Sequence, residues 1–472
     1  MKQAHFSALK RSDFGNDFIW GTSTAAFQIE GSPYSDGKKA SIWDEFSHKK
    51  GKIYEGQNAD VACDFYHRFR EDLQLMKSMN ISNFRFSISW SRILPDGTGT
   101  VNSAGLDFYD RLIDECLKIG ITPWVTLYHW DLPQALERKG GWTNRDIINW
   151  FSEYVKICVT RFGDRVNNWM VLNEPLVFLG AGHFLGIHAP GRRGVKNFIP
   201  AMHHASLCQA IGGRILRDHN PNLNIGTTFS CSYIEAYRDR EKDHKAAKRV
   251  DCLVNRLFLE LSLGYGYPFE ELPFLKRVDK FYKPEDDQLL AFEFDFIGIQ
   301  NYTRELVKNA WWIPYLQATN IKAEKRNLPT TEMGWEIYPE GLFQLLKKYD
   351  AYPGVKNILV TENGAAFPDH LINGQVKDEK RQQYLQQYMG AVLKARNQGI
   401  NVNGYFVWSF TDNFEWAEGY HPRFGLVYID YKTQQRIIKN SGLWYRDFLQ
   451  TPETPKKAMQ RSSVQHSNFF KP

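Results

Sequence analysis

The chain has 472 residues, of which 43% are hydrophobic and 24% charged, a balance that supports a large folded core and excludes wholesale disorder. Its formal net charge of +6 is small for this length and no basic block stands out, which argues against a nucleic-acid partner. No apolar run reaches about 18 residues and residues 1–16 lack the apolar stretch of a secretory signal, so we expect a cytoplasmic protein without membrane contact.

Strand-like and helix-like segments alternate eight times along the chain. The strand-like segments are short and apolar, at residues 18–21, 83–90, 122–128, 168–172, 224–229, 294–299, 358–361 and 404–410. Amphipathic helical segments between them include residues 60–79, 103–119, 145–162, 198–218 and 379–398. Because such strands suit a parallel sheet covered by helices and no Gly-rich phosphate-binding motif occurs, we predict a single (β/α)8 barrel of the TIM type over residues 1–450, with long βα loops around its mouth.

Two segments do not follow this alternation. Residues 304–336 have weak periodicity and are predicted to form a long loop over the barrel mouth, where long loops are usually functional. Residues 451–472 are polar and contain proline, and are predicted to be a frayed C-terminal tail. The six cysteines include no CxxC pair, so we expect reduced and mostly buried thiols.

Polar and aromatic residues collect where the predicted strands end, at the face of such a barrel that carries active sites. Glu174 in VLNEP and Glu362 in VTENG each follow an apolar strand directly, where a carboxylate loses hydration. Either alone is compatible with a helix N-terminus or a turn. Together on one face they form the pair that cleaves glycosides: an acid for the leaving group and an anion or nucleophile for the oxocarbenium centre. The other strand-end candidates are Gln28, Arg85, His129, Trp130, Asn173, Asn301, Tyr302, Asn363, Trp408, Glu415 and Trp416.

The two carboxyl groups are expected to set each other's protonation. While Glu362 is ionised, its charge raises the pKa of Glu174 and keeps that proton available near neutrality. Once Glu362 is glycosylated, Glu174 can lose its proton and activate water. Arg85 would keep Glu362 anionic unless it forms a purely structural ion pair, and the Tyr302 hydroxyl would hydrogen-bond the same carboxylate.

The chain resembles glycoside hydrolase family 1, the β-glucosidase family, over about residues 14–449. The matching stretches are FIWGTSTAAFQIEG, FRFSISWSRILP, TLYHWDLP, VLNEP, MGWEIYPEGL, VTENG and WSFTDNFEWAEGY. The resemblance implies a retaining, exo-acting β-glycosidase without a cofactor, with Glu174 as acid/base and Glu362 as nucleophile. It also implies a stacking floor at Trp408 and a leaving-group platform at Trp335, for which packing within its own loop is the alternative. The implied ligands of the sugar hydroxyls are Gln28, His129, Trp130, Asn173, Glu415 and Trp416.

One segment departs from the family pattern. Gln300-Asn301-Tyr302 stands where the family usually has Asn-Tyr-Tyr. An ungapped match retains Tyr302, puts Gln300 in place of the usual asparagine and gives Asn301 no matching role.

Several related activities remain open at this point. A 6-phospho-β-glucosidase is disfavoured because the Glu415 carboxylate would repel a phosphate, whereas β-galactosides and β-fucosides suit the same hydrogen-bonding residues. A non-catalytic glycan-binding protein would have lost Glu174 or Glu362, and a thioglucosidase would lack Glu174. Hydrolysis and transglycosylation use the same groups.

Other ligands are expected to be absent. The histidines form no metal pair at helical spacing, so no metal site is predicted from His183, His188, His203 and His204. The expected partners are small β-glycosides or short oligosaccharides, and the sequence carries no signal for an oligomeric state.

Overall fold

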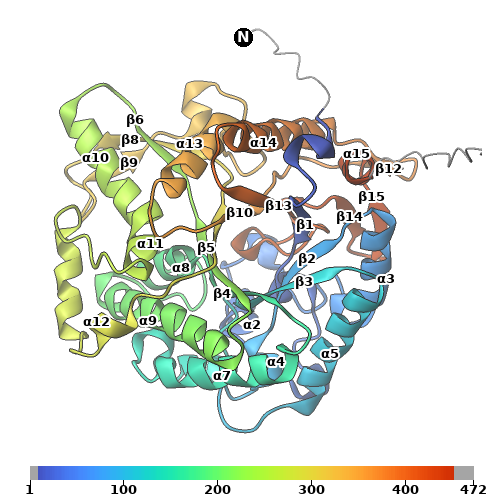
Figure 1. The fold of residues 1–472 in the computed structure, drawn as a ribbon, viewed down its shortest axis with the longest axis horizontal. Coiled ribbons are helices and arrows are strands. Elements are labelled where there is room, and N and C mark those ends of the chain that lie inside the picture. Colours follow the sequence, from blue (N-terminus) through green and yellow to red (C-terminus); the bar gives the residue numbers. More distant parts are fainter. Residues whose placement is uncertain (1–8, 451–472) are drawn as a thin grey trace, which may run out of the picture.

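The structure, a computed structural model, describes residues 9–450, so the tail predicted at residues 451–472 lies outside the described residues. Eight parallel strands close into a barrel in the order β1-β13-β10-β7-β5-β4-β3-β2, which confirms the predicted fold (Figure 1). The barrel strands are β1 (Ile19–Ser23), β2 (Asn83–Ser87), β3 (Thr122–Tyr128), β4 (Asn168–Asn173), β5 (Asn224–Ser230), β7 (Phe296–Gln300), β10 (Ile358–Asn363) and β13 (Val402–Trp408).

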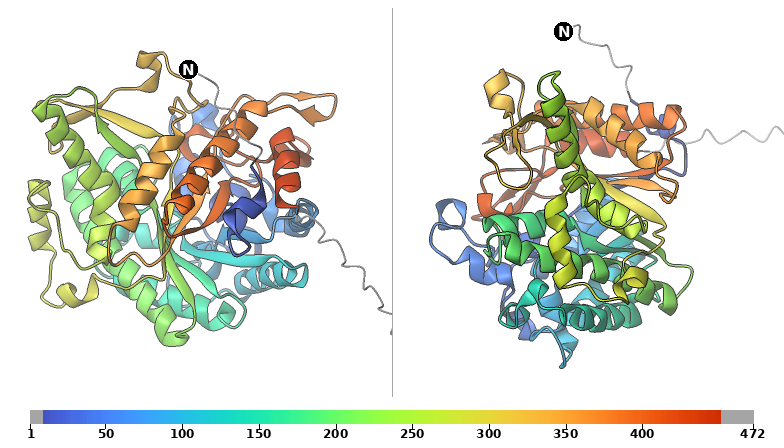
Figure 2. Two further views of the ribbon diagram at one scale, coloured as in Figure 1. Left: turned by 45° about the horizontal axis from the view of Figure 1, so that its top comes forward. Right: turned by 90° about the vertical axis from the view of Figure 1, so that its left-hand side faces the viewer.

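Helices surround these strands on all sides (Figures 1 and 2). The longer helices are α3 (Phe65–Ser78), α5 (Ser103–Lys118), α7 (Ile147–Phe162), α9 (Val195–His219), α10 (Glu241–Asp251), α13 (Pro339–Asp350), α14 (Glu379–Asn397) and α15 (Asn440–Leu449). Helix α5 illustrates why they pack inward: Phe108, Leu112 and Cys116 recur every four residues on one face and are completely or almost completely buried. Shorter helices lie in the loops: α1 (Ala26–Ile29), α2 (Ile42–Ser47), α4 (Trp90–Ile93), α6 (Gln134–Glu137), α8 (Pro175–Leu179), α11 (Leu257–Ser262) and α12 (Asp286–Leu289).

Large side chains fill the interior of the barrel and make it a packed core. Trp124 lies at its centre, with ring centroids 5.7 Å from Phe296 and 5.3 Å from Phe406. Glycines on neighbouring strands leave room for these rings, because a Cβ at Gly21 would come within 2.6 Å of Phe406 and one at Gly226 within 2.4 Å of Phe296. This packed cluster lies next to the residues of the barrel mouth, because Met170, a member of the cluster, contacts Arg85.

The prediction of a loop for the whole of residues 304–336 was wrong. Strands β8 (Arg304–Asn309) and β9 (Ala318–Asn320) pair with β6 (Tyr233–Ala236) in a three-stranded sheet, at the upper left of Figure 1. The sheet forms because Val307 and Ala318 pack against Ala246 and Val250 of α10. The weak periodicity in the sequence reflects a small sheet with a single apolar contact surface.

The remaining strands form two hairpins, β11 (Leu371–Ile372) with β12 (Gln375–Val376) and β14 (Val427–Asp430) with β15 (Gln435–Ile438). All six cysteines are buried and unpaired, as predicted. Among the helices of residues 9–450, none combines the length and the apolar character needed to cross a bilayer.

Candidate active site

A cavity of about 340 Å³ opens at the carboxyl ends of the barrel strands. It brings together most of the residues singled out from the sequence: His129, Trp130, Glu174, Tyr302, Trp335, Glu362, Trp408, Glu415 and Trp416 all line it. Gln28, Arg85 and Asn173 are fully buried and form hydrogen bonds with lining residues. The residues contributed by seven barrel strands and the loops that follow them therefore converge on one site.

Glu362, at the end of β10, is held by three donors. Gln300 Nε2 donates to its Oε1 at 2.7 Å, the Tyr302 hydroxyl donates to its Oε2 at 2.7 Å, and Arg85 Nη1 also donates to Oε1. Burial raises the pKa of Glu362, while the Arg85 charge and the Tyr302 hydrogen bond oppose that rise. Since all three partners donate hydrogen, they favour the ionised carboxylate.

Gln300 has a contact role that the sequence did not reveal. Besides Glu362, its Nε2 donates to Asn173 Oδ1 at 2.8 Å. Asn173 Oδ1 also accepts from Arg85 at 2.6 Å, which turns Asn173 Nδ2 toward His129 Nε2, 3.0 Å away. Gln300 therefore links Glu362 to Asn173, whereas Asn301 donates only to the backbone carbonyls of residues 231 and 303.

Glu174 follows β4 and precedes Pro175, in a left-handed backbone conformation with φ of 47°. A non-glycine residue in this region is strained, and such strain is concentrated at functional sites. Burial and then the charge of Glu362 raise the pKa of Glu174 well above its usual range, opposed by a hydrogen bond from Ser230 and by Arg85. Only Glu362 is held by three donors, so the pair is set to hold its proton on Glu174.

Glu415 lines the cavity and accepts a hydrogen bond from the fully buried Gln28. Gln28 Nε2 donates to Asn413 Oδ1 at 3.0 Å, to the Phe414 carbonyl at 3.0 Å and to Glu415 Oε2 at 3.3 Å. Burial, followed by the charge of Glu362, raises the pKa of Glu415 to about 8. His129 shares this region, and burial followed by the Arg85 charge lowers the pKa of His129 well below its usual range, so its ring is neutral.

Aromatic rings form an apolar part of the cavity wall. Trp130 and Trp416 lie with ring centroids 4.5 Å apart, and Trp408 is stacked on His129 at 6.1 Å. Trp130 Nε1 donates to the backbone carbonyl of Asn173 at 2.9 Å, which fixes that indole. A flat apolar surface beside carboxylate and amide groups suits a sugar ring, which has an apolar face and a hydroxyl-bearing rim.

Trp335 lies on another part of the cavity wall, near Met333 and 5.3 Å from the Tyr302 ring. Glu305 on β8 also lines the cavity, and burial raises its pKa to about 7, opposed by Arg326 and a hydrogen bond from Asn320. The sequence does not single out Glu305, because this residue lies in residues 304–336, for which a loop was expected. A strand assignment for residues 304–309 was the signal needed to find it.

Two neighbouring histidines of α9, His203 and His204, bind protein groups. His203 binds Asp286 and Tyr267, and His204 binds the backbone of Trp142. Within residues 9–450 no group of three or more His, Cys, Asp or Glu side chains is arranged to hold a metal ion.

The chain matches known proteins along nearly its whole length. The model of glycosyl hydrolase family 1 matches residues 10–454. Beta-glucosidase A of Thermotoga maritima is 45% identical over 438 residues, which cover 92% of this chain and 96% of that protein. Beta-glucosidase A of Acetivibrio thermocellus is 43% identical over 446 residues, which cover 93% of this chain and 99% of that protein.

Solved structures agree with these sequence matches. The family 1 b-glucosidase from Thermotoga maritima superposes with a TM-score of 0.89 at 44% identity, covering 92% of this chain and 98% of that one. The same enzyme in complex with deoxynojirimycin also gives a TM-score of 0.89, with the same identity and coverage. On its sequence, its fold and the arrangement of its two buried carboxylates, this chain belongs to glycosyl hydrolase family 1.

Proposed function

We propose that the protein is a retaining, exo-acting β-glucosidase that hydrolyses terminal non-reducing β-D-glucosyl residues and also accepts β-fucosyl and β-galactosyl residues. The observation that carries the proposal is the unequal environment of two buried carboxyl groups, Glu174 with a strongly raised pKa and Glu362 held by three donors. Relatives named beta-glucosidase at 43% and 45% identity support the choice of glycone.

The first step forms a covalent glycosyl-enzyme. Ionised Glu362 attacks the anomeric carbon while Glu174 gives its proton to the departing glycosidic oxygen. Loss of the Glu362 charge removes the largest cause, after burial, that raises the pKa of Glu174. Glu174 then takes a proton from water, and the hydroxide attacks the anomeric carbon and releases Glu362. No cofactor takes part in these steps.

Both apolar and hydrogen-bonding side chains hold the sugar. Trp408 is assigned as the floor under the apolar face, and Gln28 with Glu415 as the ligands of adjacent hydroxyls. His129, Trp130, Asn173 and Trp416 complete this set, and Trp335 is assigned to the leaving group. No lysine or arginine belongs to the described cavity lining, so no cation there would bind a 6-phosphate. The substrates are accordingly unphosphorylated β-glycosides and short oligosaccharides.

Initial rates on 4-nitrophenyl β-glucoside, β-fucoside, β-galactoside and 6-phospho-β-glucoside test the proposal, with Glu362→Ala as the inactive control. We expect release from the three unphosphorylated glycosides that disappears in Glu362→Ala. Release from the phosphorylated sugar alone would overturn the assignment of Glu415. A folded protein that cleaves none of the four substrates would favour a glycan-binding role.

A further inference from the structure

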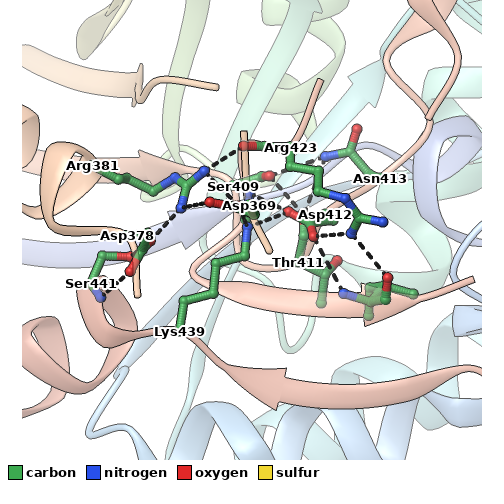
Figure 3. Close-up of polar contacts among 12 residues, drawn as sticks. Asp369, Asp378, Arg381, Ser409, Thr411, Asp412, Asn413, Arg423, Lys439 and Ser441 are labelled. Atoms are coloured by element: carbon green, nitrogen blue, oxygen red, sulfur yellow. Dashed lines mark hydrogen bonds and ion pairs between the residues drawn. The ribbon is translucent and has the colours of Figure 1, made fainter. Parts of the chain in front are cut away.

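Six charged side chains form a buried network beside the cavity, without lining it: Asp369, Asp378, Asp412, Arg381, Arg423 and Lys439 (Figure 3). Lys439 Nζ donates to Asp369 at 2.5 Å and to Asp412 at 2.6 Å. Arg381 pairs with Asp369 at 2.8 Å and with Asp378, and Arg423 pairs with Asp412 at 2.6 Å. Three carboxylates therefore face three cations, and only Arg423, with 17% of its side chain exposed, has appreciable contact with solvent.

Stability alone is a weak explanation for such a network. Removing charges from water costs several kcal/mol per ion, and replacing buried ion pairs with apolar residues is often neutral or stabilising. What the network supplies is a fixed geometry. The Asp412 carboxylate accepts from Arg423, from Lys439, from the Gly425 amide at 3.0 Å and from the Ile429 amide at 3.4 Å.

Asp412 thereby fixes the segment of residues 408–426, which carries Trp408, Glu415, Trp416 and Phe424 of the cavity lining. The next residue, Asn413, belongs to a chain of hydrogen bonds in which each donor and acceptor is fixed. The Ser409 hydroxyl donates to the Thr411 carbonyl at 2.8 Å, and Asn413 Nδ2 donates to Ser409 Oγ at 3.0 Å. Asn413 Oδ1 is thus turned toward Gln28 and accepts from its Nε2 at 3.0 Å.

This chain determines which atom of the Gln28 amide is free. Nε2 faces three acceptors, on Asn413, Phe414 and Glu415, so a reversed amide would set oxygen against oxygen. Gln28 Oε1 is buried and has no hydrogen-bond partner within the described residues. It is left as an acceptor for a hydroxyl hydrogen.

We propose that Asp412 and Asn413 are positioning residues for glycone recognition. Asp412 fixes the course of residues 408–426, and Asn413 fixes the Gln28 amide so that its Oε1 receives a hydrogen from one sugar hydroxyl. The inference rests on the proposed glycosidase function and adds the residues that determine the direction of one substrate hydrogen bond.

Deoxyfluoro sugars test this direction, because a fluorine replaces the hydroxyl without being able to donate. The measurement is kcat/KM on 4-nitrophenyl β-glucoside and on its 3- and 4-deoxyfluoro analogues, and the fluoro penalty is the ratio between them. Comparing this penalty among variants cancels the inductive effect of fluorine. We expect Gln28→Ala to reduce the penalty at one position by about 3- to 10-fold, the value of one hydrogen bond. Asn413→Ala reduces it at the same position, and the double variant matches Gln28→Ala alone.

A pair of variants, one of them charge-balanced, distinguishes a positioning role of Asp412 from a purely stabilising one. Asp412→Asn leaves an excess buried cation and lowers Tm, whereas Asp412→Asn combined with Lys439→Met restores the balance. We expect the combined variant to recover much of the lost Tm while keeping a raised KM and a reduced fluoro penalty. The control is Asp286→Asn, which removes a buried carboxylate bound to Arg145 and His203, outside the network. It lowers Tm and leaves the fluoro penalty unchanged.

Two results would overturn the inference. One is an unchanged fluoro penalty in Asn413→Ala, or penalties that add in the double variant with Gln28→Ala. The other is a charge-balanced variant in which KM and the fluoro penalty return to their wild-type values together with Tm. A wild-type protein inactive on every glycoside would instead refute the proposed function itself.

Discussion

Tyr302→Phe removes one donor from Glu362 and little else. The hydroxyl donates to Glu362 Oε2 at 2.7 Å, while the ring packs against Trp335 at 5.3 Å and Phe424 at 6.1 Å. Phenylalanine keeps these ring contacts, so the substitution isolates the hydrogen bond. Because that bond favours the ionised carboxylate, its loss raises the pKa of Glu362.

The size of the shift follows from the strength of the bond. A hydrogen bond to a charged group contributes about 1.5–3 kcal/mol, and one pKa unit corresponds to about 1.36 kcal/mol. The loss therefore raises the pKa by about one to two units, and the lower value is expected because Arg85 and Gln300 remain in place. Glu362 must be ionised to attack, so activity is lost as the pH falls through its pKa. The acidic limb of the pH profile consequently moves upward by about one unit.

The assay is kcat/KM on 4-nitrophenyl β-glucoside from about pH 4 to pH 9, whose two limbs report the apparent pKa values of the coupled pair. Tyr154→Phe serves as the matched control, because that buried hydroxyl binds the backbone carbonyls of Ile88 and Leu127 and the Cys158 side chain, and makes no contact with Glu362. An acidic limb that stays in place while the plateau falls would refute the reasoning, since Tyr302 would then act on the substrate and not through Glu362.

Four other substitutions have distinct expected results. Glu174→Gln lowers kcat/KM by about 10²- to 10⁴-fold on glycosides with poor leaving groups and far less on 2,4-dinitrophenyl β-glucoside, and an equal loss on both would contradict its role as the acid. Gln300→Ala lowers kcat/KM by about tenfold through the lost bond to Glu362, whereas Asn301→Ala lowers Tm with kcat/KM retained, since Asn301 binds only backbone. Glu305→Gln lowers kcat/KM on cellobiose by about fivefold with little change on 4-nitrophenyl β-glucoside, because a carboxylate accepts from leaving-group hydroxyls more strongly than an amide does; equal effects would place Glu305 outside that contact.

The barrel and its two carboxyl groups could be predicted because their signals are local. Short apolar strands ending in NEP or TENG need no knowledge of distant residues, and the strand predicted at residues 168–172 is observed at Asn168–Asn173. Boundaries that depend on backbone conformation were less accurate. Helix α3, predicted from residue 60, begins at Phe65 because Asp64 before it adopts a left-handed conformation with φ of 51°.

Features built from distant segments could not be predicted. Strand β8 forms its sheet by pairing with β6, as in the register of Arg304 with Tyr233, and no local pattern encodes that partner. Gln300 reaches Glu362 across 62 residues of sequence, and Lys439 reaches Asp369 across 70. Isolated polar and charged residues such as these resemble surface residues in a sequence, because burial is visible only once the partners are known.

Closure of the barrel by β1 and β13 has a consequence for protein synthesis. Ser23 pairs with Trp408, and Gln28 meets Glu415 across 387 residues of sequence. A growing chain that has left the ribosome as far as Glu362 holds both carboxyl groups but lacks the last barrel strand, with the lining residues Trp408, Glu415 and Trp416. The unfinished chain can therefore neither close its barrel nor bind a substrate. It also exposes strand edges that must be shielded until residues 402–416 emerge. Glycosidase activity in a translation reaction would thus appear only with nearly full-length chains. The moment at which it appears would report when the barrel closes.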